Sequence, residues 1–495
     1  INRDLPFDQF TIEQLAGDLL PKATVDQKIA TGFHRNTMIN QEGGIDKEQF
    51  RIESVFDRVN TTGTAWLGLT VGCAQCHDHK FDPVSQKEYY QLFAIFNNQD
   101  EPDLEIATAE EQAALEKYRQ EVETLEAMLA GLVQEAEADV LAWQKSLTPE
   151  QVANLKASIT TVLETPPDKR TLKQKLVLVD QVRQNDAKYK QSKDAFLKLE
   201  KQKPKVSSTM VLAERAEPRQ THLFIKGDFT RLGDVVSPGV IKILNPLPGT
   251  VSKPNRLDLA RWLMDPQNPL TARVTMNRVW MRYFGKGIVE TENDFGTQGT
   301  LPTHPDLLDW LARDFIRPQW SSKAMHRLIV TSATYRQSSF VRPDLNAVDP
   351  YNKLLARQNR FRLDAEIVRD VGLAASGLLT PEIGGPSVFP PIPDGVMTLG
   401  QTKREWATST GPDRYRRGLY TFFFRATPPP SLVVFDAPDN TATCTRRLRS
   451  NTPLQALNLL NDQSFVEFAH GLALRVLSEA PANDRDRLEH AFRLC

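Results

Sequence analysis

The feature that most constrains this chain is the stretch 72–83, GCAQCHDHKFDP, which places Cys73, Cys76 and His77 in the pattern Cys-x-x-Cys-His. Two thiols three residues apart on one turn of chain can reach the two vinyl groups on one edge of a porphyrin. The next residue then lies under the ring, where an imidazole can bind the iron. The spacing therefore predicts one covalent haem c, with thioether bonds to the two cysteines and His77 as iron ligand.

Two other interpretations of the same stretch stay open. Cys73, Cys76, His77 and His79 have the ligand types of a zinc site, but the adjacent residues Cys76 and His77 fit a tetrahedron poorly, and no second pair has finger spacing. A thioredoxin-like dithiol should follow a strand in a βαβ unit, a context that the surrounding sequence does not indicate.

The charge balance and the hydropathy of the chain argue against two classes of protein, nucleic-acid binders and membrane-spanning proteins. The chain has 61 Lys and Arg residues against 62 Asp and Glu residues, so no basic excess exists to neutralise phosphates, which argues against a general nucleic-acid binder. No apolar run approaches a transmembrane segment. The sequence starts at Ile1, so we expect a processed or partial product whose missing signal peptide is uninformative. Haem attachment implies export to the periplasm or the extracellular space, because it normally happens outside the cytoplasm.

The spacing of apolar residues predicts a mainly α protein. Residues 1–103 form a helical haem domain, with helices that end at Pro21, begin at a Thr24 capping box and run over about 46–68. After Pro83, a helix rich in tyrosine and phenylalanine is expected to supply an apolar wall for the haem.

Three further segments follow. Residues 104–204 have a heptad pattern and predict a long, charged antiparallel helical hairpin, either a partner-docking arm or a solvated spacer. Residues 205–250 change to a strand-like period and predict a small β segment with strands near 209–212, 222–225 and 240–244. Residues 251–495 predict a mostly helical C-terminal domain with a loop-rich stretch and a Leu-rich helix over 453–477.

Several other stretches accompany the Cys-x-x-Cys-His motif. They are 31–36, 42–46, 57–62, 277–280, 294–296, 304–311, 332–338, 435–439 and 451–457. Together with 73–83 they resemble a family of planctomycete cytochrome c domain proteins, in which a haem-binding domain is followed by a C-terminal domain of unknown function. The resemblance implies an exported haem protein and a chain that starts inside the first domain and stops inside the last. It supplies no reaction.

A sixth iron ligand would separate electron transfer from catalysis. The candidates are His34, Met38, His79, His222, His304 and Met397. His79 is only two residues from His77 and reaches the opposite haem face with difficulty. His34 lies in the family-like stretch 31–36 beside Arg35, which can pair a haem propionate. We predict His34 as distal ligand and Arg35 as propionate partner; the alternative is a buried structural histidine.

Other polar clusters have weaker patterns. Glu42, Asp46 and Glu48 are calcium-type ligands around a Gly-Gly turn but lack EF-hand spacing. Asp436 and Asp439 are either a carboxylate pair for acid–base chemistry or caps of a Pro-rich loop.

The remaining alternatives concern charge, thiols and function. The run 446–449 faces an acidic partner or sugar sulfates, or forms a salt-bridged helix start. Cys444 and Cys495 either pair in an oxidising compartment or stay free.

The first functional hypothesis is a c-type cytochrome that exchanges electrons with a redox partner. The alternatives are a haem-dependent oxidoreductase acting on an extracellular substrate such as carbohydrate, and a structural module stapled by haem.

Overall fold

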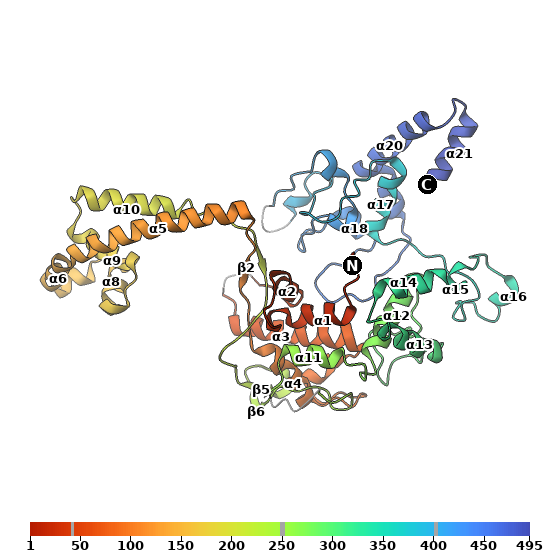
Figure 1. Ribbon diagram of the computed structural model, residues 1–495, viewed down its shortest axis with the longest axis horizontal. Coiled ribbons are helices and arrows are strands. Elements are labelled where there is room, and N and C mark those ends of the chain that lie inside the picture. The colour runs from red at the N-terminus through yellow and green to blue at the C-terminus, as the bar shows by residue number, and fades with distance from the viewer. Residues whose placement is uncertain (41–43, 248–252, 400–403) are drawn as a thin grey trace. The chain divides into compact units, whose positions relative to one another are not determined.

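The computed structural model describes residues 1–40, 44–247, 253–399 and 404–495 (Figure 1). About 54% of the chain is helical and 5% is strand, which confirms a mainly α protein. The chain divides into two compact units. The first joins residues 1–100 to residues 212–495, and the second is formed by residues 101–211.

The first hundred residues fold into short helical elements. They are α1 (Phe7–Ala16), η1 (Gly17–Leu19), α2 (Val25–Ala30), η2 (Thr31–Arg35), α3 (Lys47–Thr62), the π-helical turn η3 (Gly63–Leu67), η4 (Val71–Gln75) and α4 (Gln86–Asn97). The predicted capping box is present: Thr24 Oγ1 accepts from Gln27 N–H, and the Gln27 side chain accepts from Thr24 N–H. The helix predicted over 46–68 consists of α3 and η3 and ends at Gly68, which adopts φ +60°.

The aromatic residues of α4 form the centre of the first unit. Tyr89, Tyr90 and Phe93 are fully buried and contact the rings of Phe56 on α3 and Phe224. These rings were expected to face a haem, and they fill the hydrophobic core. Burying several large rings in one cluster stabilises the packing of α3 against α4.

Short strands join this region to the rest of the first unit. β1 (Gln99–Asp100) pairs with β4 (Ala213–Glu214), and β5 (Thr221–Phe224) pairs with β6 (Leu232–Val236), both antiparallel. The prediction of a strand over 240–244 was wrong. Ile241 is fully buried there, but the segment is irregular, and Lys242 N–H donates to Glu88 Oε1 instead of a neighbouring strand.

The C-terminal part is built from many short helices. They are α11 (Arg256–Leu263), α12 (Thr271–Phe284), α13 (Pro305–Ile316), α14 (Ser322–Thr331), α15 (Ala333–Arg336), α16 (Pro343–Asn346), α17 (Ala365–Ser376), η7 (Val396–Thr398), η8 (Gly411–Tyr415), η9 (Gly418–Tyr420), α18 (Pro430–Val434), α19 (Pro453–Asn461), α20 (Gln463–Glu479) and α21 (Asp484–Leu494). The helix predicted over 453–477 is two helices, because Asp462 leaves the helical conformation and caps α20.

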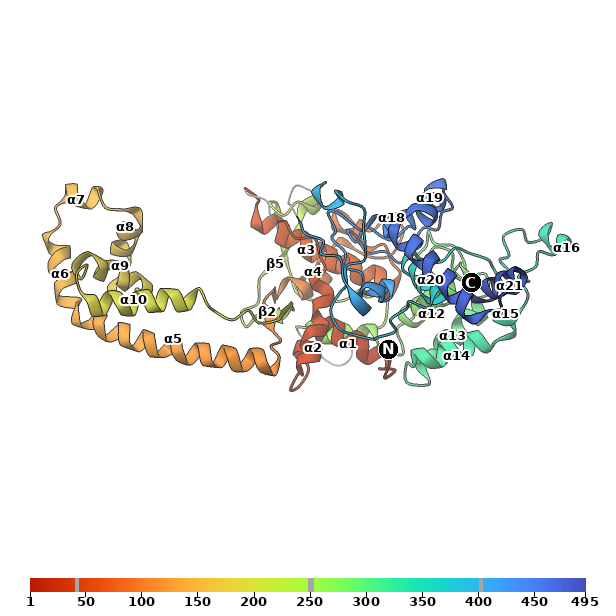
Figure 2. The same cartoon turned by 90° about the horizontal axis from the view of Figure 1, so that it is seen from above.

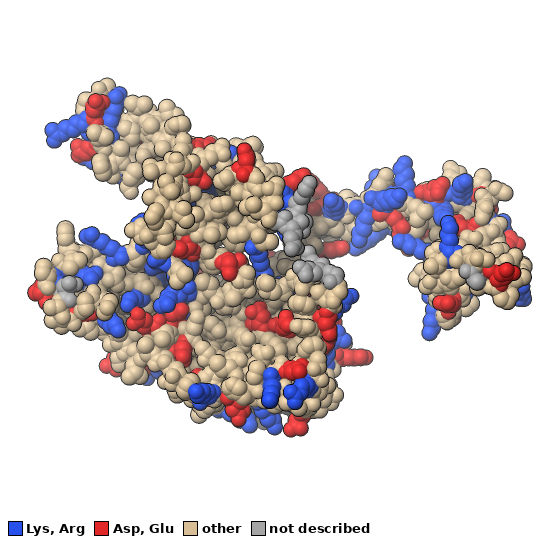
Figure 3. Space-filling model, turned by 180° about the vertical axis from the view of Figure 1, so that it is seen from behind, with Lys and Arg blue, Asp and Glu red and all other residues tan. Residues whose placement is uncertain are grey.

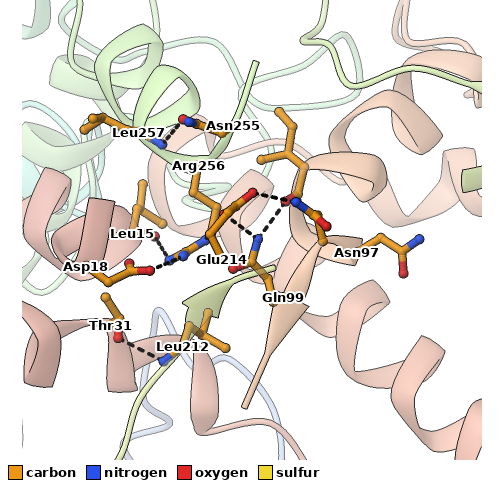
Figure 4. Close-up of polar contacts among 12 residues, drawn as sticks. Leu15, Asp18, Thr31, Asn97, Gln99, Leu212, Glu214, Asn255, Arg256 and Leu257 are labelled. Carbon is orange, nitrogen blue, oxygen red and sulfur yellow. Dashed lines mark hydrogen bonds and ion pairs between the residues drawn. The ribbon is translucent and has the colours of Figure 1, made fainter. Parts of the chain in front are cut away.

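A buried arginine connects the beginning of α11 to the N-terminal helices (Figure 4). The Arg256 side chain is 0% exposed. Its guanidinium donates to Leu15 O at 2.9 Å, to Asp18 Oδ2 at 2.7 Å and to Glu214 Oε2 at 3.4 Å. Glu214 also accepts from Gln99 Nε2 at 2.9 Å. The buried positive charge is thus paired with two carboxylates.

The second unit contains α5 (Ala109–Glu135), α6 (Glu137–Ser146), α7 (Pro149–Ala153), α8 (Ala157–Glu164), η5 (Pro167–Lys169), α9 (Leu172–Val182) and α10 (Ala187–Glu200). α5 and α10 lie side by side (Figures 1 and 2), and β2 (Asp103–Glu105) pairs with β3 (Ser208–Met210). The sequence predicts a hairpin of two long helices, but this unit contains more and shorter helices. The predicted second helix is divided into α9 and α10, because Asp186 caps a new helix start by accepting from Tyr189 N–H.

Two surface properties bear on the predicted partners. Within the described ranges, no helix has the length and apolar character needed to cross a bilayer. On the face shown in Figure 3, Lys and Arg side chains are interspersed with Asp and Glu side chains.

Candidate functional site

The Cys-x-x-Cys-His turn begins on η4, and a loop connects it to α4. Cys73 lies within η4 and Cys76 follows its end, and both thiols are exposed and unpaired. Gln75 O, between them, accepts from Tyr90 Oη at 3.0 Å and from Gln86 Nε2 at 3.1 Å. The aromatic helix therefore fixes the backbone of the turn while both sulfur atoms stay accessible.

His77 has one ring nitrogen engaged. Its Nδ1 lies 2.6 Å from Asp78 O. Because a carbonyl oxygen can only accept, Nδ1 carries the proton and Nε2 keeps its lone pair. A metal-bound histidine usually has this arrangement, with one nitrogen fixed by a backbone carbonyl and the other directed to the metal. The exposed imidazole is thus in a tautomer that can bind iron.

His79 is committed to the loop instead. Its Nδ1 accepts from Asp82 N–H at 2.8 Å and from Phe81 N–H at 3.3 Å, so its Nε2 is the protonated nitrogen and donates to Thr70 Oγ1 at 3.2 Å. Both nitrogens are occupied, which weighs against His79 as a zinc or iron ligand. Across the described ranges, no group of three or more His, Cys, Asp or Glu residues is arranged to hold a metal ion.

The end of the loop packs against a C-terminal segment. The buried Asp82 accepts from Thr297 N–H at 2.7 Å and from Thr297 Oγ1 at 3.0 Å. A Cβ atom at Gly296 would lie 2.3 Å from Asp82 Oδ2, so only glycine allows this approach. Phe295 N–H also donates to Gly68 O at 2.8 Å. The stretch 294–296 therefore positions the thiol-bearing loop.

The β5–β6 hairpin approaches the second thiol. Gly227 has φ +76°, and a Cβ atom there would lie 2.7 Å from Cys76 Sγ. The same hairpin exposes three aliphatic side chains, Ile225 at 40%, Leu232 at 57% and Val235 at 56%. Exposed apolar side chains in the hairpin that touches Cys76 provide a surface on which an apolar group can lie.

His34 is in a different environment. It is 2% exposed, its ring contacts Phe33 and Phe96 edge to face, and its Nε2 has no hydrogen-bond partner. Burial lowers the pKa of His34 well below its usual value, and the positive charges of Arg58 and Arg256 lower it further. The imidazole is therefore neutral at neutral pH.

His34 borders a cavity of about 600 Å³. We call it the arginine cavity, defined by His34, Asp57, Arg278, Arg282 and Arg425. Sequence reasoning gave no role to the last four residues. A signal for two of them was present, because Asp57 and Arg278 fall in the stretches 57–62 and 277–280 noted above.

The structure thus separates the predicted site residues into two groups. Cys73, Cys76 and His77 share one surface turn, which does not line the arginine cavity. His34 and Arg35 are buried on η2, and among the described residues no hydrogen bond or ring contact joins His34 to that turn. Their assignments as distal ligand and propionate partner remain predictions.

The surroundings of the other candidate iron ligands do not indicate a metal site. His222 Nδ1 lies 2.9 Å from Gly233 O, and His304 Nδ1 lies 2.9 Å from Thr303 Oγ1. Met38 is exposed, and Met397 is buried. Cys444 and Cys495 are exposed and unpaired.

The calcium-type residues Asp46 and Glu48, only a weak candidate for a calcium site, have protein partners. Asp46 accepts from the first backbone N–H groups of α3, and Glu48 pairs with Arg51 at 2.7 Å. Glu42 lies outside the described residues.

The other charged candidates also have structural partners. Asp436 accepts from Ser450 N–H at 2.7 Å, and Asp439 accepts from Thr441 N–H at 3.0 Å, so both carboxylates fix loops. The arginines of 446–449 form ion pairs: Arg446 with Glu292, Arg447 with Glu366 and Arg449 with Asp364. The salt bridges expected for that run are confirmed, but residues 446–449 are irregular and do not begin a helix as expected.

Comparisons with known proteins agree with a two-domain arrangement. Residues 1–101 match the family model PSCyt2, a protein of unknown function (DUF1549), and residues 255–495 match the family model PSD1, a protein of unknown function (DUF1553). This pair is typical of planctomycete-type proteins. No curated protein and no solved structure matches the chain. Neither family match shows a haem-binding cytochrome domain.

Proposed function

We propose that this chain is an exported c-type cytochrome that holds one haem through Cys73, Cys76 and His77 and exchanges electrons with a redox partner or a substrate-oxidising system. The observation that carries the proposal is the state of these three side chains. Two unpaired, exposed thiols and an imidazole with a free Nε2 occur on one turn. This donor set fits a covalently bound haem, which supplies one-electron redox chemistry when bound.

The residues around the turn have defined tasks in this proposal. Asp78 O fixes the tautomer and the orientation of His77. The hydrogen bonds to Gln75 O hold the spacing of the two sulfur atoms. Ile225 and Leu232 of the adjoining hairpin offer apolar surface that excludes water from the ring. Export follows from the chemistry, since thioether attachment normally takes place outside the cytoplasm.

The sixth position on the iron is not assigned by these contacts. His34, with Arg35 as propionate partner, remains our prediction for it. The iron spectrum distinguishes the functions: six-coordinate, low-spin iron supports electron transfer. Five-coordinate, high-spin iron favours the alternative, a haem-dependent oxidoreductase with an extracellular substrate.

The test is the mass of the denatured protein after expression in a host that attaches haem c. We expect the mass of the polypeptide plus one haem, and the bare polypeptide mass for the double variant Cys73→Ser, Cys76→Ser. Cys495→Ser removes another exposed thiol, outside the motif, and should keep the haem. A bare polypeptide mass for the unmodified chain contradicts the proposal, and one zinc ion per chain in that sample would support the metal-site alternative.

A further inference from the structure

The arginine cavity carries an inference that is independent of haem. Its volume of about 600 Å³ lies in the range of small-molecule sites. Its walls come from η2 and α3 on one side and from α12 and the segment 423–445 on the other. Residues from both family-matched parts of the chain therefore surround one space.

Two of its arginines are not neutralised by a carboxylate of their own. Arg425 donates to the backbone oxygens of Asn36, at 2.7 Å, and Thr37, at 3.3 Å. Arg282 is half exposed and pairs with Asp364 at 3.2 Å, a carboxylate that Arg449 also approaches. Backbone carbonyls and a shared carboxylate leave excess positive charge at the cavity wall.

Arg278 adds a third positive charge. Its Nη groups donate to the backbone oxygens of Thr64 and Ala65, and its buried Nε has no partner. Burial lowers the pKa of Arg278 to about 10, while the negative charge of Glu292 acts in the opposite direction. The guanidinium therefore stays protonated at neutral pH and retains an unused donor.

The single carboxylate of the cavity also lacks a protein partner. Asp57 is half-buried, and it forms no hydrogen bond or ion pair with another described residue. Burial raises the pKa of Asp57, although Arg58 and Arg425 act in the opposite direction. His34 Nε2 is a further buried, unpartnered atom of a lining residue. Buried polar groups are normally paired, so these two buried atoms, Arg278 Nε and His34 Nε2, are unusual, and the half-buried Asp57 carboxylate remains available to a ligand in the cavity.

The rest of the lining consists mostly of hydroxyl and amide side chains. They belong to Asn36, Thr37, Thr61, Asn440, Thr441, Thr443 and Thr445. Thr61 Oγ1 and Thr443 Oγ1 lie 2.7 Å apart and connect the two walls. Such groups both donate and accept, which suits a ligand that carries several hydroxyl groups.

We propose that the arginine cavity binds a small hydroxylated oxyanion, a monosaccharide or disaccharide with a carboxylate or sulfate group. Guanidinium groups at the wall pair with the oxyanion, and Asp57 accepts hydrogen bonds from ligand hydroxyls. A bare inorganic anion does not fit this lining as well, because Asp57 would repel it and would stay unpaired.

The experiment is calorimetric titration of the full chain with glucuronate, glucose 6-sulfate, glucose and inorganic sulfate. We expect glucuronate or glucose 6-sulfate to bind at least about tenfold more tightly than glucose and sulfate, since a charge-assisted hydrogen bond is worth about 1.5–3 kcal/mol. The stronger of the two sugars identifies carboxylate or sulfate as the recognised group. Equal binding of glucose or of sulfate alone would overturn the proposal, and so would the absence of binding by both anionic sugars.

Variants locate the binding. Arg282→Gln changes a half-exposed side chain and should weaken the anionic sugar about tenfold or more with an unchanged melting curve. Arg342→Gln removes another exposed arginine with a carboxylate partner, outside this cavity, and should bind like the unmodified chain. Arg425→Gln is the second site variant, used if the first fails to fold. Full affinity in a folded site variant contradicts the assignment.

Discussion

In two regions, arginines connect the N-terminal helices to later parts of the first unit. The two regions differ in the partners of the guanidinium groups. Arg256 is fully buried, and its guanidinium is paired with Asp18 and Glu214 (Figure 4). Arg278 and Arg425 border a cavity of about 600 Å³ and donate mainly to backbone carbonyl groups. In the first region the guanidinium pairs with two carboxylates, although Asp18 Oδ1 has no hydrogen-bond partner of its own. In the second region the arginines have no carboxylate of their own.

The difference separates a structural contact from a binding site. A charge moved out of water is costly unless carboxylates and hydrogen bonds replace the water. In the Arg256 region the protein itself supplies two carboxylates and a backbone carbonyl to the guanidinium. In the arginine cavity the half-buried Asp57 has no hydrogen bond or ion pair with another described residue, and a ligand can supply one. The comparison predicts that substitutions in the first region reduce stability, whereas those in the second reduce binding.

The largest effect is expected for Arg256→Gln. It leaves the carboxylates of Asp18 and Glu214 without their buried cation, which typically costs about 3–5 kcal/mol. Denaturant unfolding followed by tryptophan fluorescence measures the free energy of unfolding. Arg282→Gln is the matched control from the cavity and should change it by less than about 1 kcal/mol, because its ion pair is exposed. Equal losses in both variants would remove the distinction between the two regions.

A smaller effect is expected for Asp82→Asn. Asp82 is buried and accepts two hydrogen bonds from Thr297, so the substitution should cost about 1.5–3 kcal/mol. The same unfolding experiment measures it, with Asp344→Asn in an exposed ion pair as control. An unchanged free energy of unfolding in Asp82→Asn would show that the Asp82 contact does not position the thiol-bearing loop. The contact between Asp82 and Thr297 would then contribute as little to stability as the arginines of the cavity.

The pH dependence of stability tests the neutral state of His34. Its pKa is lowered by burial, so the unfolded chain binds the proton more tightly, and stability is lost as the pH falls below 6.5. The slope reaches at most about 1.4 kcal/mol per pH unit for one proton. His34→Leu should lack this part of the slope. His304→Gln changes a half-buried histidine elsewhere and should retain it. Parallel curves for His34→Leu and the unmodified chain would mean that His34 is not the group responsible.

The sequence predicts the local features of this molecule and misses the assembled ones. The Thr24 capping box and the turn with Cys73, Cys76 and His77 depend on residues within a few positions, so their pattern is legible in the chain. The hydrogen bond from Arg256 to Asp18 joins residues 238 positions apart. No hydrophobic period or local sequence motif predicts a pair so far apart in the chain. The strand prediction over 240–244 was wrong for the same reason: Lys242 N–H donates to Glu88 on the distant helix α4 instead of to a neighbouring strand.

The smallest predicted effect is also the most direct test of the comparison. Burial raises the pKa of Asp57 above 3.8, so the folded state holds this proton more tightly than the unfolded state does. The folded state is therefore penalised at pH values above the raised pKa, and the penalty disappears as the pH falls toward 3.8. Asp57→Asn removes the charge without changing the shape. We expect the variant to be more stable than the unmodified chain at pH 7, by less than about 1 kcal/mol, and the difference to shrink on acidification.

The unfolding free energy of both proteins between pH 7 and pH 4 measures this difference, with Asp344→Asn as the control at an exposed ion pair. A loss of stability in Asp57→Asn at pH 7 would mean that Asp57 is bound by Arg425 or Arg58 as firmly as Asp18 is bound by Arg256. The arginine cavity would then be a second structural network. A gain of stability together with weaker sugar binding has the opposite meaning, because a carboxylate that costs folding energy is retained for a ligand.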